Sequence, residues 1–180
     1  MIGALVAGIT GSGGASLSSY ESIATATGTG SSGTITFSSI PSGFKHLQIR
    51  GIYADGGYNL NMRFNSDSAS NYARHTLNGS GSAVAAAGAA SQAQMDFGAY
   101  GAAAANTVSA CIIDILDYGS TSKYKTVRVL AGYDENGSGG IWISSGLWQS
   151  TSAVSSLSIL NLYGSYYTRT QFALYGIKEA

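Results

Sequence analysis

Two histidines are the side chains of this sequence best suited to act as general bases near neutral pH. His46 follows Lys45 at the start of an alternating segment, and His75 follows Arg74 in a short segment of β-forming residues. The chain has no Gly-x-Ser-x-Gly nucleophile motif to go with them. We therefore interpret both histidines as surface or interface residues, and we expect no catalytic residues and no enzymatic activity.

Metal and cofactor chemistry finds little support in the residue types present. One cysteine, Cys111, and two distant histidines cannot form a structural zinc site. Cys111 lies in an apolar run, where a buried hydrophobic role is favoured over a reactive thiol. Asn65, Asp67 and Asn71 carry oxygens that calcium could bind, but no acidic cluster accompanies them, so an ordered turn is favoured. We expect no metal and no cofactor.

Two further patterns contain residue types that could take part in chemistry. Asp114 and Asp117 are three residues apart at the end of a predicted strand, so they should face opposite sides, unlike the facing carboxylates of a glycosidase. The glycine runs at 11–14 and 137–140 are not followed by Lys and Ser or Thr, so they do not predict a phosphate-binding loop.

Aromatic side chains leave a glycan-binding alternative open. Trp142, Trp148 and the tyrosines of 163–167 could stack on sugar rings if they are exposed. Strand alternation, however, predicts that about half of such residues belong to the core.

Composition restricts the class of partner. Of 180 residues, nine are basic and nine acidic, so the net charge is zero, and charged residues make up 10% of the chain against about 25% in an average domain. Such a surface has little field with which to attract nucleic acid or an anionic membrane. Hydrophobic residues at 44% and twelve tyrosines indicate a folded domain. Low charge also permits close association between copies.

The first residues differ in character from the rest. Residues 1–9 are apolar but contain no basic residue, make a poor signal peptide and are too short to span a membrane, so we expect synthesis in the cytoplasm. Residues 10–19 resemble a flexible Gly-Ser linker. We expect residues 1–19 to form an arm that docks onto a partner through Ile2, Leu5, Val6 and Ile9, and residues 20–180 to form the folded domain.

Alternating apolar and polar residues predict strands along most of this domain. Residues 80–106, rich in Gly, Ser and Ala, are instead interpreted as a long loop, with one possible strand at 92–97. About nine or ten strands without a long helix predict an all-β antiparallel sandwich or barrel. The expected strands are 20–27, 34–37, 46–52, 59–64, 72–77, 108–116, 123–133, 140–148, 155–163 and 168–177.

The same alternation predicts which side chains point into the core. The predicted core residues are Leu47, Ile49, Leu60, Met62, Phe64, Val127, Val129, Leu157, Ile159, Phe172 and Leu174.

Several short blocks resemble virion structural proteins of tailed phages, especially phages of cyanobacteria and marine bacteria. The blocks are SYESIAT (19–25), ITFSSIP (35–41), FKHLQIR (44–50), MRFNSD (62–67), NY (71–72) and FALYGIK (172–178). The resemblance covers about residues 19–178, although 80–106 matches only in length and composition. Family members usually have Gly at the position of Ser66, so a local difference is expected in that turn.

The resemblance implies a jelly-roll-type sandwich that serves as a capsid cement (decoration) protein or as part of a tail fibre. The apolar arm favours cement, because a short apolar segment on a linker is suited to clamping a subunit onto its neighbour. We therefore expect a homotrimer on the capsid surface that binds the major capsid protein and copies of itself, with neither nucleic acid nor membrane as partner. The alternatives are a fibre module that recognises host glycan and, least favoured for want of an acid pair, a depolymerase.

Overall fold

The computed structural model describes residues 19–178, and this part of the chain contains twelve strands and no helix. The expected arm with Ile2, Leu5, Val6 and Ile9 lies outside the described residues. The strands are β1 (Tyr20–Thr27), β2 (Thr34–Phe37), β3 (His46–Tyr53), β4 (Asn59–Phe64), β5 (Tyr72–Gly79), β6 (Val84–Gln92), β7 (Met95–Tyr100), β8 (Ser109–Leu116), β9 (Lys125–Asp134), β10 (Gly139–Trp148), β11 (Leu157–Leu160) and β12 (Gln171–Ile177).

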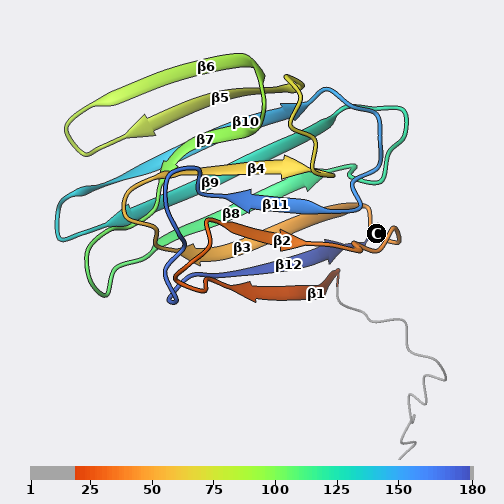
Figure 1. Cartoon of the computed structure of the whole chain (residues 1–180). Helices are drawn as coiled ribbons and strands as arrows, with labels where there is room; N and C mark the ends of the chain where they lie inside the picture. The colour runs from red at the N-terminus through yellow and green to blue at the C-terminus, as the bar shows by residue number, and fades with distance from the viewer. Residues whose placement is uncertain (1–18, 179–180) are drawn as a thin grey trace, which may run out of the picture.

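Eight of these strands are connected as a jelly roll (Figure 1). Working inward from the two ends of the described chain, β1 pairs with β12, β2 with β11, β3 with β8 and β4 with β7, all antiparallel. The strands alternate between two sheets, so that β1, β12, β3 and β8 lie in one and β2, β11, β4 and β7 in the other. A long hairpin rolled up in this way is a jelly roll. The predicted antiparallel jelly-roll-type sandwich is confirmed.

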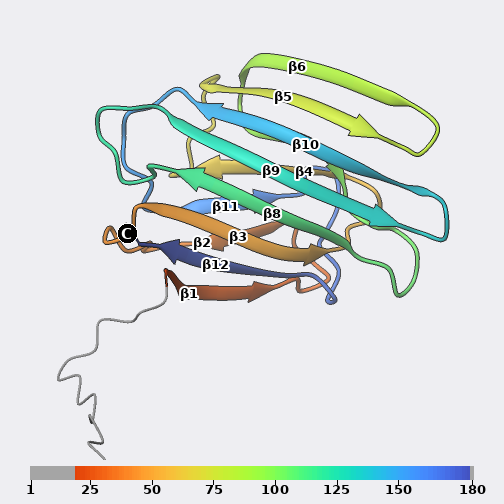
Figure 2. The ribbon, with the colours of Figure 1, turned by 180° about the vertical axis from the view of Figure 1, so that it is seen from behind.

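Two inserted hairpins enlarge one sheet of the roll. β5 and β6 come between β4 and β7 in the chain, and β9 and β10 come between β8 and β11. Together they extend the sheet beyond β8, giving the order β1-β12-β3-β8-β9-β10-β5-β6 opposite the four-stranded sheet β2-β11-β4-β7. Figure 2 shows the outer face of this eight-stranded sheet. β7 packs against β10 and β5, whereas β6 packs substantially only against β5.

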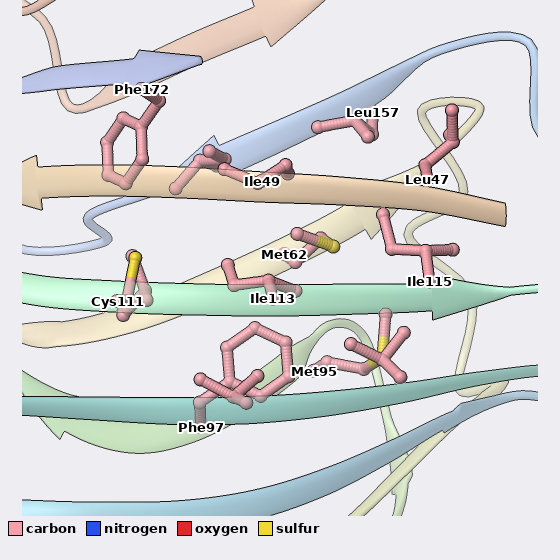
Figure 3. Packing of buried hydrophobic residues seen from close by; sticks show 14 of the residues in the cluster. Leu47, Ile49, Met62, Met95, Phe97, Cys111, Ile113, Ile115, Leu157 and Phe172 are labelled. Atoms are coloured by element: carbon pink, nitrogen blue, oxygen red, sulfur yellow. The ribbon is translucent and has the colours of Figure 1, made fainter. Parts of the chain in front are cut away.

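Apolar side chains from the two facing sheets form one core (Figure 3). Ile49 and Ile113 from the large sheet meet Met62 and Leu157 from the small one. All eleven side chains predicted to be in the core are at most 3% exposed, which confirms the strand registers inferred from the alternation.

The prediction of a long loop over residues 80–106 is wrong, because this segment forms β6 and β7, of which β7 overlaps residues 95–97 of the possible strand at 92–97. β6 is mostly alanine, which has a low intrinsic preference for strands, so its conformation depends on pairing with β5. β7 turns Met95, Phe97 and Ala99 into the core, but the pattern is short and lies in a segment rich in small residues.

In two turns, positive φ angles explain which residue types are favoured at those positions. Asn136 and Gly137, with φ of 59° and 92°, connect β9 to β10 in the left-handed conformation expected of an Asn-Gly hairpin. Asn65 and Ser66 also have positive φ, 50° and 58°. Ser66, at the position where members of the resembling family usually have Gly, therefore occupies a conformation that glycine adopts at lower cost.

Replacing Phe64 by Ala should lower the free energy of unfolding by about 3–5 kcal/mol. Phe64 is fully buried, and its ring packs 5.4 Å from that of Trp148. Chemical denaturation monitored by tryptophan fluorescence measures the loss. The control is Tyr163→Ala, which truncates an aromatic ring that is 75% exposed and should cost less than about 1 kcal/mol. Equal losses for the two variants would contradict the assigned core.

Candidate interaction surface

The two histidines have structural surroundings. The Nδ1 of His46 accepts a hydrogen bond of 2.9 Å from the backbone N–H of Asp117. The ring of His75 occupies the space left by Gly88, where a Cβ atom would come within 2.9 Å of it. Asp117 bonds Lys123 through Oδ2, and this contact is the main cause of its lowered pKa, with Lys45 and His46 adding smaller effects.

The other candidates for chemistry are likewise engaged elsewhere. Cys111 is buried, which raises the pKa of its thiol to about 12 and confirms its interpretation as a hydrophobic core residue. Asp67 accepts hydrogen bonds from Ala69, Asn71 and Trp148, so the predicted ordered turn is confirmed. Within residues 19–178, no group of three or more His, Cys, Asp and Glu side chains could hold a metal ion.

Most of the aromatic residues proposed for glycan stacking are in the core. Trp142 and Trp148 are only 5% and 2% exposed, and Tyr166 is fully buried. Tyr167 is partly exposed, and Tyr163 is 75% exposed, with its ring centroid 5.9 Å from that of Tyr58.

The outer face of the eight-stranded sheet carries a group of exposed apolar side chains, which we call the apolar belt. Each member is between 41% and 59% exposed. The members are Ile52 from β3, Ile112 from β8, Leu130 from β9, Ile141 and Ile143 from β10, and Leu77 from β5.

Strand register makes the belt continuous. Leu77 lies opposite Ile143, Ile143 opposite Leu130, and Leu130 opposite Ile112. Opposite residues of an antiparallel pair have Cβ atoms about 4.5–5.5 Å apart, so these four side chains form an unbroken row across four strands. Sequence reasoning missed this row because it used alternation only to identify core residues and considered no second apolar face.

Small residues leave two hollows beside the row. Gly132 and Ala110 are opposite each other between Ile141 and Ile52, and they form the floor of one hollow. The other lies over Ala86 of β6, next to Leu77 and Ile143, and the ring of His75 forms part of its wall. On this face, large apolar side chains therefore alternate with hollows that are also lined mainly by apolar residues. A partner's side chains can pack into these hollows.

A polar row borders the belt along the sheet. Its carboxylate, Asp114, accepts hydrogen bonds from Gln48 (2.8 Å) and Arg128 (3.4 Å). Arg128 lies opposite Ser145, which lies opposite His75. An apolar centre with a polar border is the usual anatomy of a protein interface.

Apart from the belt, a group of buried polar atoms lies near the start of the β3–β4 connection. Asp55 is 1% exposed, and its Oδ1 accepts hydrogen bonds from the backbone N–H groups of Gly57 and Tyr58. Its Oδ2 and the hydroxyls of Tyr53 and Tyr166 have no hydrogen-bond partner in the described protein. Burial raises the pKa of Asp55 to about 6, although the two backbone bonds oppose the shift.

Comparison of the chain with protein-family models, curated proteins and solved structures finds no match. Within the described residues, no helix has the length and apolar character needed to cross a membrane.

Asp55 should make the protein less stable as the pH rises through about 6. Its pKa is raised in the folded state, so its contribution is fully present below the unfolded pKa near 4 and is lost as the pH passes the folded pKa. The loss should reach up to about 3 kcal/mol. Asp55→Asn should remove this slope in melting curves recorded from pH 4 to 8.

The control is Glu135→Gln, whose effect should have the opposite pH dependence. Bonds from Ala104 and Thr107 are the main causes of the lowered pKa of Glu135, so the stability that it contributes is lost only as the pH falls below its ordinary range. An unchanged slope above pH 5 in Asp55→Asn would contradict the assignment.

Proposed function

We propose that this chain is a non-enzymatic virion structural protein of a tailed phage, and that it acts as a capsid cement (decoration) protein bound to the major capsid protein. The apolar belt carries this proposal. Isolated soluble proteins rarely expose large contiguous apolar patches, and such a patch with a polar border is characteristic of an interaction site. A protein whose work is adhesion needs such a surface and no catalytic centre.

The dimensions of the sheet are adequate for a stable joint. Eight strands about 4.8 Å apart, with about eight residues each, give an outer face of roughly 1,000 Å². A standard interface buries about 800 Å² on each partner. A partner that covers most of this face, and not the belt alone, would therefore bury enough surface without the electrostatic attraction that a neutral chain cannot supply.

Fold and sequence resemblance support the phage assignment in different ways. Jelly rolls occur in capsid proteins, but also in lectins and cupins, so the topology is compatible with several functions. The sequence blocks at 19–25, 35–41, 44–50 and 172–178 are what favour a virion protein among these.

One observation favours the fibre alternative. Tyr58 and Tyr163 form an exposed pair of rings at one end of the sandwich, and nearby Arg169 lies 4.6 Å from the ring of Tyr167. Exposed aromatic rings of this kind can stack on sugars. A fibre module should bind host-surface polysaccharide in pull-down assays and lose that binding in Tyr163→Ala, whereas a cement protein should show neither result.

Particles that carry this chain should show it on the shell surface in cryo-electron microscopy, and particles lacking it should release DNA at lower temperature. Purified protein added back should restore heat resistance. The double variant Leu130→Ser/Ile143→Ser should restore it at least about tenfold less well at equal concentration, because two belt side chains each worth about 1.5–3 kcal/mol of burial are removed.

The matched control is Leu162→Ser, which removes a leucine of similar exposure (41% against 48% for Leu130) outside the belt. It should bind particles as the unmodified chain does. Density located on the tail, or equal binding by the belt variant and the control, would overturn the proposal.

Deletion of residues 1–18 should leave the melting temperature of the sandwich nearly unchanged but weaken binding to particles. Burial of Ile2, Leu5, Val6 and Ile9 at a neighbour would contribute about 1.5–3 kcal/mol per side chain before the cost of ordering the segment. A drop of ten degrees or more in melting temperature would instead assign these residues to the protein's own sheet. If the deletion changed neither the melting temperature nor particle binding, residues 1–18 would have no part in attachment to the capsid.

A further inference from the structure

The outer edge of β6 is an open place in the eight-stranded sheet. β6 ends the sheet and pairs only with β5, so one row of its backbone N–H and C=O groups has no strand beside it among the described residues. The side chains from Val84 to Gly88 are exposed on both faces of the sheet. A free edge of this length is a template for another strand.

The other three edges in the described structure have features that discourage pairing. β1 carries a bulge and a charged residue, Glu21, which is ion-paired at 2.9 Å with Lys178. β2 has only four residues. β7 contains Asp96 and a left-handed Gly98 with φ of 66°. Charges, bulges and shortness are the usual protections of edge strands.

β6 has none of these protections along most of its length. It contains no charged residue and no proline, and its register with β5 is regular from Val84 to Ala89, with a bulge only beyond that point. Alanine and glycine contribute little to strand stability by themselves. A strand of this composition, supported on one side only, gains most from a second strand on its open side.

We propose that β6 pairs antiparallel with β6 of a second copy of this chain, about a two-fold axis. Residues 85–90 carry no side chain larger than a methyl group, so pairing between copies brings Ala opposite Ala or Gly without a clash. The zero net charge of the chain keeps repulsion between copies small.

The joint would merge two eight-stranded sheets into one and bring two apolar belts onto a common face, with Leu77 of each copy on the strand next to β6. This inference goes beyond attachment to the capsid, because it assigns a site of self-association. A two-fold joint makes dimers, or joins trimers in pairs if another surface builds the trimer.

The first experiment places charge on the edge. In Ala85→Lys/Ala87→Lys, both substitutions lie on one face of β6, and the pairing would bring like charges from the two copies together. Sedimentation equilibrium of the full chain should show a dimer dissociation constant raised at least about tenfold. The control Thr151→Lys/Ala153→Lys adds the same two charges at the same spacing in an exposed loop and should change it less than about twofold. Circular dichroism and melting temperature establish that both variants are folded.

The second experiment identifies the neighbour of the strand. In a two-fold antiparallel pair that continues one sheet, one residue lies opposite its own copy, within the range of Cα distances that a disulfide spans. Single cysteines introduced in turn at each of residues 85–90 should give a disulfide-linked dimer under mild oxidation, with a maximum at one position. The native Cys111 is buried and should remain unlinked.

A chain that is monomeric at 100 μM would overturn the inference, as would an assembly unaffected by the lysines on β6. An assembly that persists while every β6 cysteine remains unlinked would mean that another segment occupies this edge, and the proposed pairing would be wrong. These outcomes are independent of particle binding, so the inference and the proposed function can fail separately.

Discussion

The fold is governed by the unequal size of its two sheets. A four-stranded sheet cannot cover the whole inner face of an eight-stranded one. The size and type of the inward-facing side chains of the large sheet therefore change with the part of the small sheet that lies opposite. On β10, Trp142 and Trp148 fill the space at the two ends of the strand, and between them Gly146 makes room for Met95 of β7, whose Sδ would lie 2.5 Å from a Cβ at that glycine. Thr76 of β5 and Ser144 of β10 both donate hydrogen bonds to the backbone carbonyl of Phe97 in β7. On β6, where the cover has ended, the side chains shrink to alanine.

This inequality also explains how far the sequence could predict the structure. Alternation in β3, β4, β9, β11 and β12 identifies the inner faces, because one apolar face of each strand meets a well-formed partner sheet. In β8 the adjacent Ile112 and Ile113 are 41% and 0% exposed, and no local pattern tells which of two isoleucines faces inward. Apolar residues on both faces of a strand predict that both faces are buried, yet the outer face of β8 is exposed to solvent in the described structure. β6 is undetectable from propensity, since only its pairing with β5 holds it extended.

Some features of the site depend on contacts between distant segments and could not be predicted from the sequence. Lys125 is fully buried, and its ammonium donates to the carbonyl of Lys123 at 2.8 Å and lies 5.9 Å from the ring centroid of Trp148. A lysine at the start of an amphipathic strand would ordinarily be assigned to solvent. Asp55 likewise reads as part of an exposed Asp-Gly-Gly turn, but its carboxyl fills the space over Gly101, where a Cβ would come within 1.9 Å of its Oδ1. Burial of that carboxyl, and the raised pKa that follows from it, arise from a residue 46 positions away.

The two faces of the inserted hairpins differ in what they contact, because their inner faces join the core and their outer faces carry most of the apolar belt. The eight rolled strands contain Leu47, Ile49, Met62, Phe64 and Phe172, and their pairing order already closes a jelly roll. The hairpins β5–β6 and β9–β10 contribute four of the six belt residues and, within residues 19–178, the one unprotected edge. Because function resides in sites carried by a fold and not in the fold itself, substitutions on the outer faces of these hairpins can change the partner while the inner faces continue to pack. The mutational consequence is a sharp contrast across one strand: on β10, Trp142 faces the core at 5% exposure, and its neighbour Ile143 faces outward at 59%, so adjacent substitutions should affect folding and association separately.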